Sequence, residues 1–180
     1  MKTAKEMYDY CLSNKLGSGF NASNSIKHFD VIASNLGPDE DVLFVFIGLH
    51  NYVSATKHDN NFAYAITNKR IMMGQKKVIG QNFQSVSLDQ VNDITFSSGL
   101  AFGVITIDTI KERFNVALDK AQAQNINNQI HDLLLKLKSK PEPAATSLNY
   151  DEIYKLKQLL DDGLITEEEF QKKKSDILNL

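Results

Sequence analysis

The 180-residue sequence has no tryptophan, three prolines and one cysteine, Cys11. A single cysteine excludes a disulfide within the chain and suits a reducing compartment, so we expect a cytoplasmic protein. Long hydrophobic runs are also missing. The longest, Val42 to Leu49, is far short of the roughly 20 apolar residues that span a bilayer. The first ten residues lack the apolar centre of a signal peptide, so we expect neither a signal peptide nor a membrane span.

An excess of charge of one sign is absent as well. The sequence has 20 Lys and Arg against 22 Asp and Glu, a formal net charge of -2. Such a chain has no strong field with which to attract nucleic acid, so we expect no nucleic-acid partner. With 42% hydrophobic and 23% charged residues, the composition is typical of a soluble globular protein. The length suits one domain with appendages.

Residue patterns that carry catalysis are missing too. Gly17-Ser18-Gly19 has none of the rest of a nucleotide-binding fingerprint and is interpreted as a break between helices. Cys11 has no neighbouring base and is interpreted as a half-buried structural residue. Asp39-Glu40-Asp41 is interpreted as the solvated start of a strand. We therefore predict that the protein is not an enzyme and holds no metal or cofactor.

The four histidines have no metal-ligand spacing to each other, to cysteine or to a carboxylate. His50 and His58 flank the first predicted hairpin loop, where a metal or proton-transfer site is the alternative to plain solvated side chains. We favour the solvated interpretation because no accompanying motif exists. The histidines are His28, His50, His58 and His131.

Residues from about 3 to 36 are predicted to be helical, with a break at residues 16–21. We expect Ser23 or Ser25 to cap the second helix and Gly37-Pro38 to end it. The apolar residues of this helix fall on one face, which must cover another surface. They are Ile26, Phe29, Ile32, Ala33 and Leu36.

From Val42 to Leu118 the hydrophobic period switches to two, which predicts β-strands. Asn68-Lys69 is expected to form a tight hairpin turn, because asparagine tolerates a positive φ. Short strands at this spacing are typical of an antiparallel sandwich or barrel. The expected strands are residues 42–47, 61–67, 70–74, 83–88, 91–96, 102–107 and 113–118.

A last long helix is predicted after Asp119, which is suited to cap it. Its apolar residues form one stripe, which we expect to pack into the core at one end of the β-structure. They are Ile126, Ile130, Leu133, Leu134 and Leu137. The following residues 139–148 contain Pro141-Glu142-Pro143 and have the composition of a linker.

Residues 149–180 are predicted to form a helical hairpin. Gly163 suits the left-handed position after the first helix, and Thr166 with Glu169 forms a capping box for the second. A segment this short rarely buries a sufficient core, so we expect it to bind something. Another copy or another protein is favoured over docking on the chain's own β-domain. The expected contact surface is Leu156, Leu159, Leu160, Leu164, Phe170 and Ile177.

Two resemblances follow from these patterns. Seven strands followed by one helix resemble a pleckstrin-homology (PH) domain, and Tyr64 to Met72 with Gln84 to Ile94 is similar to bacterial PH-like domains of the YokE-like kind. The tail, with Gly163 and Ile165-Thr166-Glu167-Glu168-Glu169-Phe170, resembles a SHOCT (short C-terminal) domain. The resemblances imply an α+β protein in which a PH-like, seven-stranded antiparallel barrel or sandwich is capped by a C-terminal helix. The expected parts are an N-terminal helical segment (1–37), the PH-like domain (38–138), a linker (139–148) and the helical hairpin (149–180).

The predicted function is therefore binding and assembly, with the PH-like domain as a platform. The tail is expected to drive homo-oligomerisation or docking of a protein partner. The alternative is a peripheral membrane module, because PH domains that bind lipid gather cations near the first hairpin loop. Here those cations would be Lys57, Arg70, Lys76 and Lys77.

Overall fold

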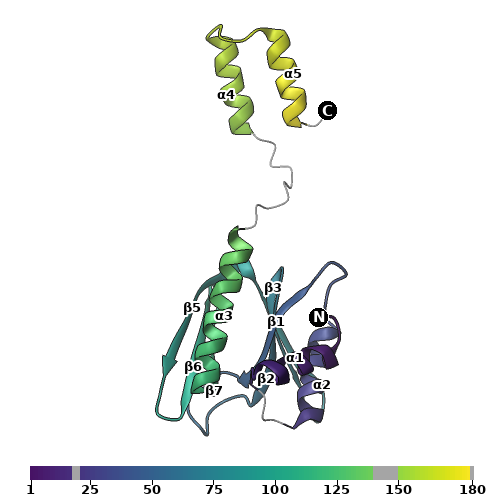
Figure 1. Cartoon of the computed structure of the whole chain (residues 1–180), viewed down its shortest axis with the longest axis vertical. Helices are drawn as coiled ribbons and strands as arrows, with labels where there is room; N and C mark the ends of the chain where they lie inside the picture. Colours follow the sequence, from purple (N-terminus) through teal and green to yellow (C-terminus); the bar gives the residue numbers. More distant parts are fainter. Residues whose placement is uncertain (18–20, 140–149, 179–180) are drawn as a thin grey trace. The chain divides into compact units, whose positions relative to one another are not determined.

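The structure, a computed structural model, describes residues 1–17, 21–139 and 150–178. The chain divides into two compact units, Met1–Leu137 and Lys138–Leu180. Most of the predicted linker, residues 140–148, lies outside the described residues. The elements of the first unit are α1 (Ala4–Asn14), α2 (Ala22–Ala33), β1 (Val42–Leu49), β2 (Asn61–Thr67), β3 (Arg70–Lys76), β4 (Gln81–Ser87), the short 3₁₀ helix η1 (Leu88–Gln90), β5 (Val91–Ser98), β6 (Phe102–Thr109), β7 (Arg113–Asp119) and α3 (Lys120–Ser139) (Figure 1). The last two residues of α3 are counted with the second unit. The helices of the second unit are α4 (Tyr150–Asp161) and α5 (Glu167–Leu178).

The seven strands form one antiparallel sheet in the order β4-β3-β2-β1-β7-β6-β5. The sheet is open, with β4 and β5 as its edges. β1 and β7 are joined through one residue pair, Leu49 with Ala117. The other neighbouring strands pair along much of their length. The predicted α+β class and the seven strands are confirmed. The narrow join divides the sheet into two parts, β1–β4 and β5–β7.

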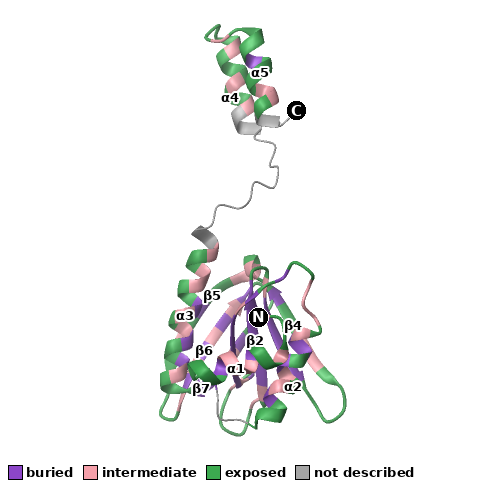
Figure 2. Cartoon of the chain, turned by 45° about the vertical axis from the view of Figure 1, so that its right-hand side comes forward, coloured by how far each residue is buried: buried purple, intermediate pink, exposed green. Residues whose placement is uncertain are grey.

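Helix α2 packs on one face of the β1–β4 part (Figures 1 and 2). Small residues of adjacent strands, Ala63 and Ala65 of β2 and Gly74 of β3, let the helix approach the sheet closely. A Cβ atom on Gly74 would lie 3.0 Å from a side-chain carbon of Ile32. Phe29 and Ile32 are fully buried here, so the apolar face predicted for this helix covers the sheet.

An aromatic core fills the opposite face of the same strands. Phe46 of β1 stacks on Tyr64 of β2 with ring centroids 4.6 Å apart. Helix α3 packs on the β5–β7 part, where Gly103 leaves room for Ala123. Ile126 and Ile130 are fully buried, which confirms the predicted apolar stripe as part of the core. Strands β1 and β2 are thus buried on both faces.

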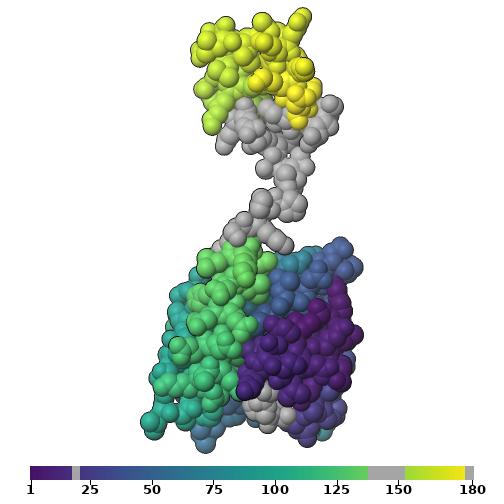
Figure 3. Space-filling model, in the orientation of Figure 1, coloured from purple at the N-terminus to yellow at the C-terminus, as the bar shows by residue number. Residues whose placement is uncertain are grey.

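The α1 and α3 helices meet at the surface of the first unit (Figure 3). A small groove between them, about 250 Å³ in volume, is lined by Tyr10, Phe44 and Leu133 among others. The segment after α1 is also tied to the core, because Gly17 donates its N–H to Gln122 Oε1 of α3 at 3.0 Å. The N-terminal helices therefore belong to the folded body of the first unit.

Two predicted local details are wrong. Asn21, and neither Ser23 nor Ser25, caps α2: its side-chain oxygen accepts a hydrogen bond from the Ser23 N–H at 3.0 Å. Asn68 does not adopt a positive φ. The β2–β3 turn is instead held by the Thr67 hydroxyl, which accepts from the backbone N–H groups of Lys69 and Arg70. A side-chain acceptor thus replaces the left-handed residue that the sequence suggested.

Other predicted caps are confirmed. The Asp119 carboxylate accepts from the N–H groups of Ala121 and Gln122 at the start of α3. In the tail, Gly163 has φ 70°, so α4 ends in a left-handed residue. The N–H of Glu169 donates to Thr166 Oγ1 and the N–H of Thr166 donates to Glu169 Oε2, which completes the capping box of α5.

Candidate functional site

The tail hairpin has a very small interior. Among its described side chains only Phe170 of α5 is buried, at 9% exposed, with Lys174 over its ring. Leu156 and Leu160 are half-buried. Leu164 in the turn is 70% exposed and Leu159 is 39% exposed, while the side chain of Ile177 lies outside the described residues. Two of the six predicted contact residues are therefore exposed and two are half-buried, so the hairpin leaves apolar surface open to solvent within this unit.

A buried ion pair lies near the N-terminal end of β3. Glu40, predicted to be solvated, is 2% exposed, and its two oxygens accept from Arg70 Nε and Nη2 at 2.9 and 2.8 Å. Arg70 and further donors, among them the Gly37 N–H and the Thr67 hydroxyl, lower the pKa of Glu40 to about 2. Arg70 also donates to the Asn35 carbonyl at 2.8 Å. The arrangement fastens the end of α2 to β3.

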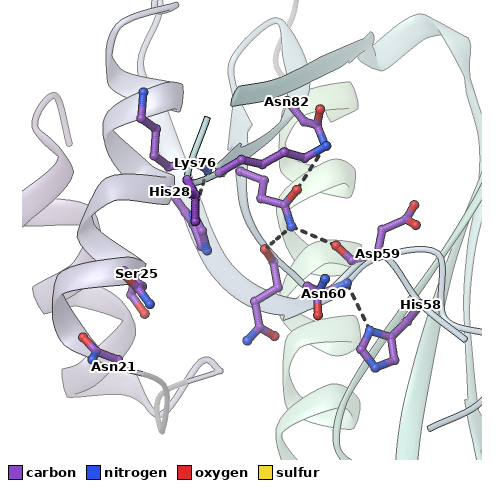
Figure 4. Close-up of a pocket in the computed structure, with 13 residues that line it drawn as sticks. Asn21, Ser25, His28, His58, Asp59, Asn60, Lys76 and Asn82 are labelled. Carbon is purple, nitrogen blue, oxygen red and sulfur yellow. Dashed lines mark hydrogen bonds between the residues drawn. The ribbon is translucent and has the colours of Figure 1, made fainter. Parts of the chain in front are cut away.

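A polar pocket of about 880 Å³ lies between α2, the β1–β2 loop and the β3–β4 hairpin (Figure 4). Figure 4 shows Asn21, Ser25 and His28 of the α2 segment on one side and loop residues 58–60 on the other. The full lining is Asn21, Asn24, Ser25, His28, His58, Asp59, Asn60, Asn61, Gln75, Lys76, Lys77, Val78 and Asn82. Amides and other polar groups dominate this lining.

Gln75 holds the loops around the pocket in place. Its side-chain nitrogen donates to the carbonyls of Asp59 and Asn61 at 2.8 and 3.2 Å, and its oxygen accepts from Asn82 Nδ2 at 3.0 Å. One acceptor is left over, because the buried side-chain oxygen of Asn61 has no hydrogen-bond partner. A fixed, polar and incompletely satisfied pocket is suited to a hydrogen-bonding ligand.

The four cations proposed for lipid binding are not all brought together. Lys76 and Lys77 line the pocket. Lys57 belongs to the same β1–β2 loop, but its side chain is not part of the lining. Arg70 lies at the opposite end of β3 from Lys76. The guanidinium of Arg70 is bound to Glu40. The sequence pattern gave no sign that α2 supplies a wall of this pocket.

His50 is buried, so its interpretation as a solvated loop residue is wrong. It is 1% exposed and stacks on Phe62 with ring centroids 4.1 Å apart. Its Nδ1 is hydrogen-bonded to the Tyr64 hydroxyl, while Nε2 has no partner. Burial lowers the pKa of His50 to about 4, so the ring is neutral at pH 7. The alternation of Phe46 and Gly48 in β1 with His50, the residue directly after it, was the available signal for an inward side chain.

Cys11 is 1% exposed, which is more buried than predicted. Burial raises the pKa of its thiol to about 12, so the thiol is an inert part of the core. Across the described residues, no group of three or more His, Cys, Asp or Glu side chains is placed to hold a metal ion. In the same part of the chain, no helix has the length and apolarity needed to cross a membrane.

Two family models match parts of the chain. A family model described as "Bacterial PH domain" matches residues 36–132, more than half of the chain, and one described as "Short C-terminal domain" matches residues 151–178. Among solved structures, the chain is similar to one titled "Vps36 N-terminal PH domain", with 16% identity and a TM-score of 0.45, covering 58% of this chain and 86% of that one. It is also similar to the C-terminal domain of an unknown protein from Leishmania infantum, with 16% identity and a TM-score of 0.43, covering 61% and 93% of the two chains. No curated protein matches the sequence.

Proposed function

This chain belongs to the bacterial PH domain family, and from that premise we propose that it is a cytoplasmic, non-enzymatic binding and assembly protein. PH and SHOCT domains are non-catalytic types of module, and together they indicate a binding or adaptor protein. In this proposal the first unit is the platform. The SHOCT domain joins it to further copies of the chain or docks a protein partner.

The observation that carries the proposal is the exposed apolar surface of the tail. Among the described side chains of the hairpin only Phe170 is buried, so the described part has little hydrophobic stabilisation of its own. Leu159, Leu164 and the 65%-exposed Tyr154 would be covered if two hairpins packed together. Burial of such side chains is the main driving force for association. The tail is therefore proposed as the assembly surface.

Light scattering coupled to size-exclusion chromatography tests the proposal. The full chain is expected to be oligomeric, and a chain truncated after Ala144 is expected to be monomeric. The double variant Tyr154→Ser/Leu164→Ser replaces apolar side chains that are 65% and 70% exposed, and it should behave like the truncation. Gln158→Ser/Asp162→Ser changes exposed polar neighbours in the same segment and should remain oligomeric. A full chain that stays monomeric at about 100 μM would contradict self-association, since the dissociation constant would then exceed that concentration.

Binding of anionic lipid is the second candidate, favoured by Lys76 and Lys77 on one pocket. It has less support, because Arg70 is engaged by Glu40 and the net charge is -2. Sedimentation with phosphatidylglycerol vesicles at low and at moderate salt tests it. No binding at low salt, where screening is weakest, would end this candidate.

A further inference from the structure

The open sheet has two edges, and they are protected to different degrees. At the β5 edge, the register with β6 shifts between Val91 and Asp93. The Asp93 carboxylate also accepts the N–H of the next residue, Ile94, at 2.8 Å. Irregular pairing, a charged side chain and an occupied donor all keep an edge strand from pairing with another chain. The β5 edge is therefore protected against a further strand.

The β4 edge has none of these protections. β4 pairs with β3 from Gln81 to Ser87 without a shift in register. Its seven residues include no charged side chain and no proline. Among the described residues, no backbone-to-backbone hydrogen bond joins β4 to any element other than β3. A regular, uncharged edge with unused backbone donors and acceptors is suited to receive another strand.

The β3–β4 hairpin determines which backbone groups of β4 point outward. The Lys77 N–H donates to the Gly80 carbonyl at 3.2 Å, which makes these residues a hydrogen-bonded pair. Hydrogen-bonded and non-hydrogen-bonded pairs alternate along an antiparallel ladder. The register therefore directs alternate residues of β4 toward β3 and leaves the N–H and C=O groups of the others pointing outward. The outward residues are Gln81, Phe83, Ser85 and Ser87.

We propose that this edge pairs with β4 of a second copy of the chain, antiparallel and centred on Gln84. In that register Phe83 lies opposite Ser85 of the second copy, so that outward groups meet outward groups. Gln81 lies opposite Ser87 of the second copy in the same way. Gln84 meets its own equivalent, and two amide side chains can donate to and accept from each other. Each outward backbone group of β4 thus gains a hydrogen-bond partner.

Charge favours a second copy as the occupant of this edge. An uncharged strand places no like charges opposite each other when it pairs with itself. The charges beyond its two ends are opposite in sign, since Lys77 precedes β4 and the exposed Asp89 follows it in η1. Antiparallel pairing turns the Lys77 end of one copy toward the Asp89 end of the other. Electrostatic attraction is therefore added at both ends of the paired strands.

A pair of strands alone is only marginally stable in water. We therefore expect the pairing in the full chain, where association of the tails raises the effective concentration of the β4 edges. In this respect the inference rests on the proposed self-association of the tail. The chain truncated after Ala144 is expected to leave this edge unpaired.

Disulfide cross-linking of the full chain tests the β4 contact. Gln84→Cys places two thiols opposite each other at its centre, where Cα atoms about 4.5 Å apart permit a disulfide. Air oxidation with copper phenanthroline should then give a covalent dimer on a non-reducing gel. Ser97→Cys, at an exposed position of the β5 edge, is the matched control and should react about tenfold more slowly. Truncation after Ala144 should slow the Gln84→Cys reaction about tenfold as well.

A backbone substitution separates strand pairing from side-chain effects. In the Gln84→Cys chain, Ser85→Pro removes an outward N–H and should abolish the cross-link. Ser85→Ala removes the same hydroxyl but keeps the N–H, so the cross-link should persist. Equal cross-linking of these two variants would overturn the β4 contact.

Light scattering on the same samples separates this inference from assembly through the tail. If the full chain is oligomeric and Gln84→Cys reacts no faster than Ser97→Cys, the β4 contact is overturned and assembly through the tail stands. A strand of a different protein as the occupant of the edge would give this same negative result. A full chain that is monomeric and forms no cross-link would overturn both.

Discussion

The two units of this chain use helices in opposite ways. In the first unit, α2 and α3 cover a sheet, and residues such as Phe29, Ile32, Ile126 and Ile130 become fully buried. In the described part of the second unit, α4 and α5 pack on each other, and Leu164 is 70% exposed. Amphipathic helices thus contribute to a self-sufficient core in the first unit and to a much smaller one in the second. The difference supports the proposal that the second unit is completed by another copy of the chain or a protein partner.

The largest expected effect comes from truncating one phenylalanine in each unit. Phe29→Ala should lower the free energy of unfolding of the first unit by about 3–5 kcal/mol, because it leaves a cavity under α2. Phe170→Ala should leave that free energy unchanged and abolish amide protection in α4 and α5. Urea denaturation and hydrogen exchange of the full chain measure the two results. Loss of first-unit stability in Phe170→Ala would show that the units stabilise each other and would break the comparison.

Breaking the buried ion pair tests how far the first unit depends on polar groups. Arg70→Ala leaves the Glu40 carboxylate buried without its main partner, so stability should fall by about 3 kcal/mol. Arg113→Ala removes the partner of Asp108 from an exposed pair and should cost less than about 1 kcal/mol. Urea denaturation at pH 7 compares the two variants. Equal losses would mean that Glu40 is reached by water after the arginine is removed.

How much of the fold and of the candidate site could be predicted from the sequence depended on how far apart along the chain the interacting residues lie. The caps at Gly163 and Thr166 and the apolar stripe of α3 are each visible in a short stretch of sequence, and each was predicted correctly. Glu40 and Arg70 are 30 residues apart, and nothing in the local pattern around either one indicates the other. The solvated interpretation of Glu40 therefore failed. The polar pocket was not predicted, for the same reason: its α2 wall is placed by the docking of that helix on Gly74, which lies far away in the sequence.

The buried histidine predicts a pH dependence confined to the first unit. The pKa of His50 is about 4 in the folded chain against an ordinary value of 6.5, so the unfolded chain binds more protons between these values. Stability from this group is complete above pH 6.5 and falls as the pH drops toward 4, by about 2 kcal/mol at pH 5. Urea midpoints measured from pH 7 to 5 should show this fall in the wild type.

His50→Gln keeps a polar partner for Tyr64 but does not titrate, so its midpoint should vary less with pH. A smaller slope should remain, because burial lowers the pKa of His28 as well. His131→Gln changes an exposed histidine and should retain the wild-type slope. A slope in His50→Gln as steep as in the wild type would contradict the assignment to His50.

The smallest effect compares the same capping device in both units. Thr3 caps α1 and Thr166 caps α5, each in a capping box with a glutamate three residues later. Replacement of either by alanine should cost about 1 kcal/mol. In the first unit this loss is shared by a cooperative core, so Thr3→Ala should lower the urea midpoint slightly and leave hydrogen exchange in α1 slow. In the tail the same loss is large relative to the free energy of unfolding of the hairpin, so Thr166→Ala should speed hydrogen exchange throughout α4 and α5. If α5 in Thr166→Ala stays as well protected from exchange as α1 in Thr3→Ala, the tail is already covered by a partner surface. The contrast between the two units would then hold only for the isolated hairpin.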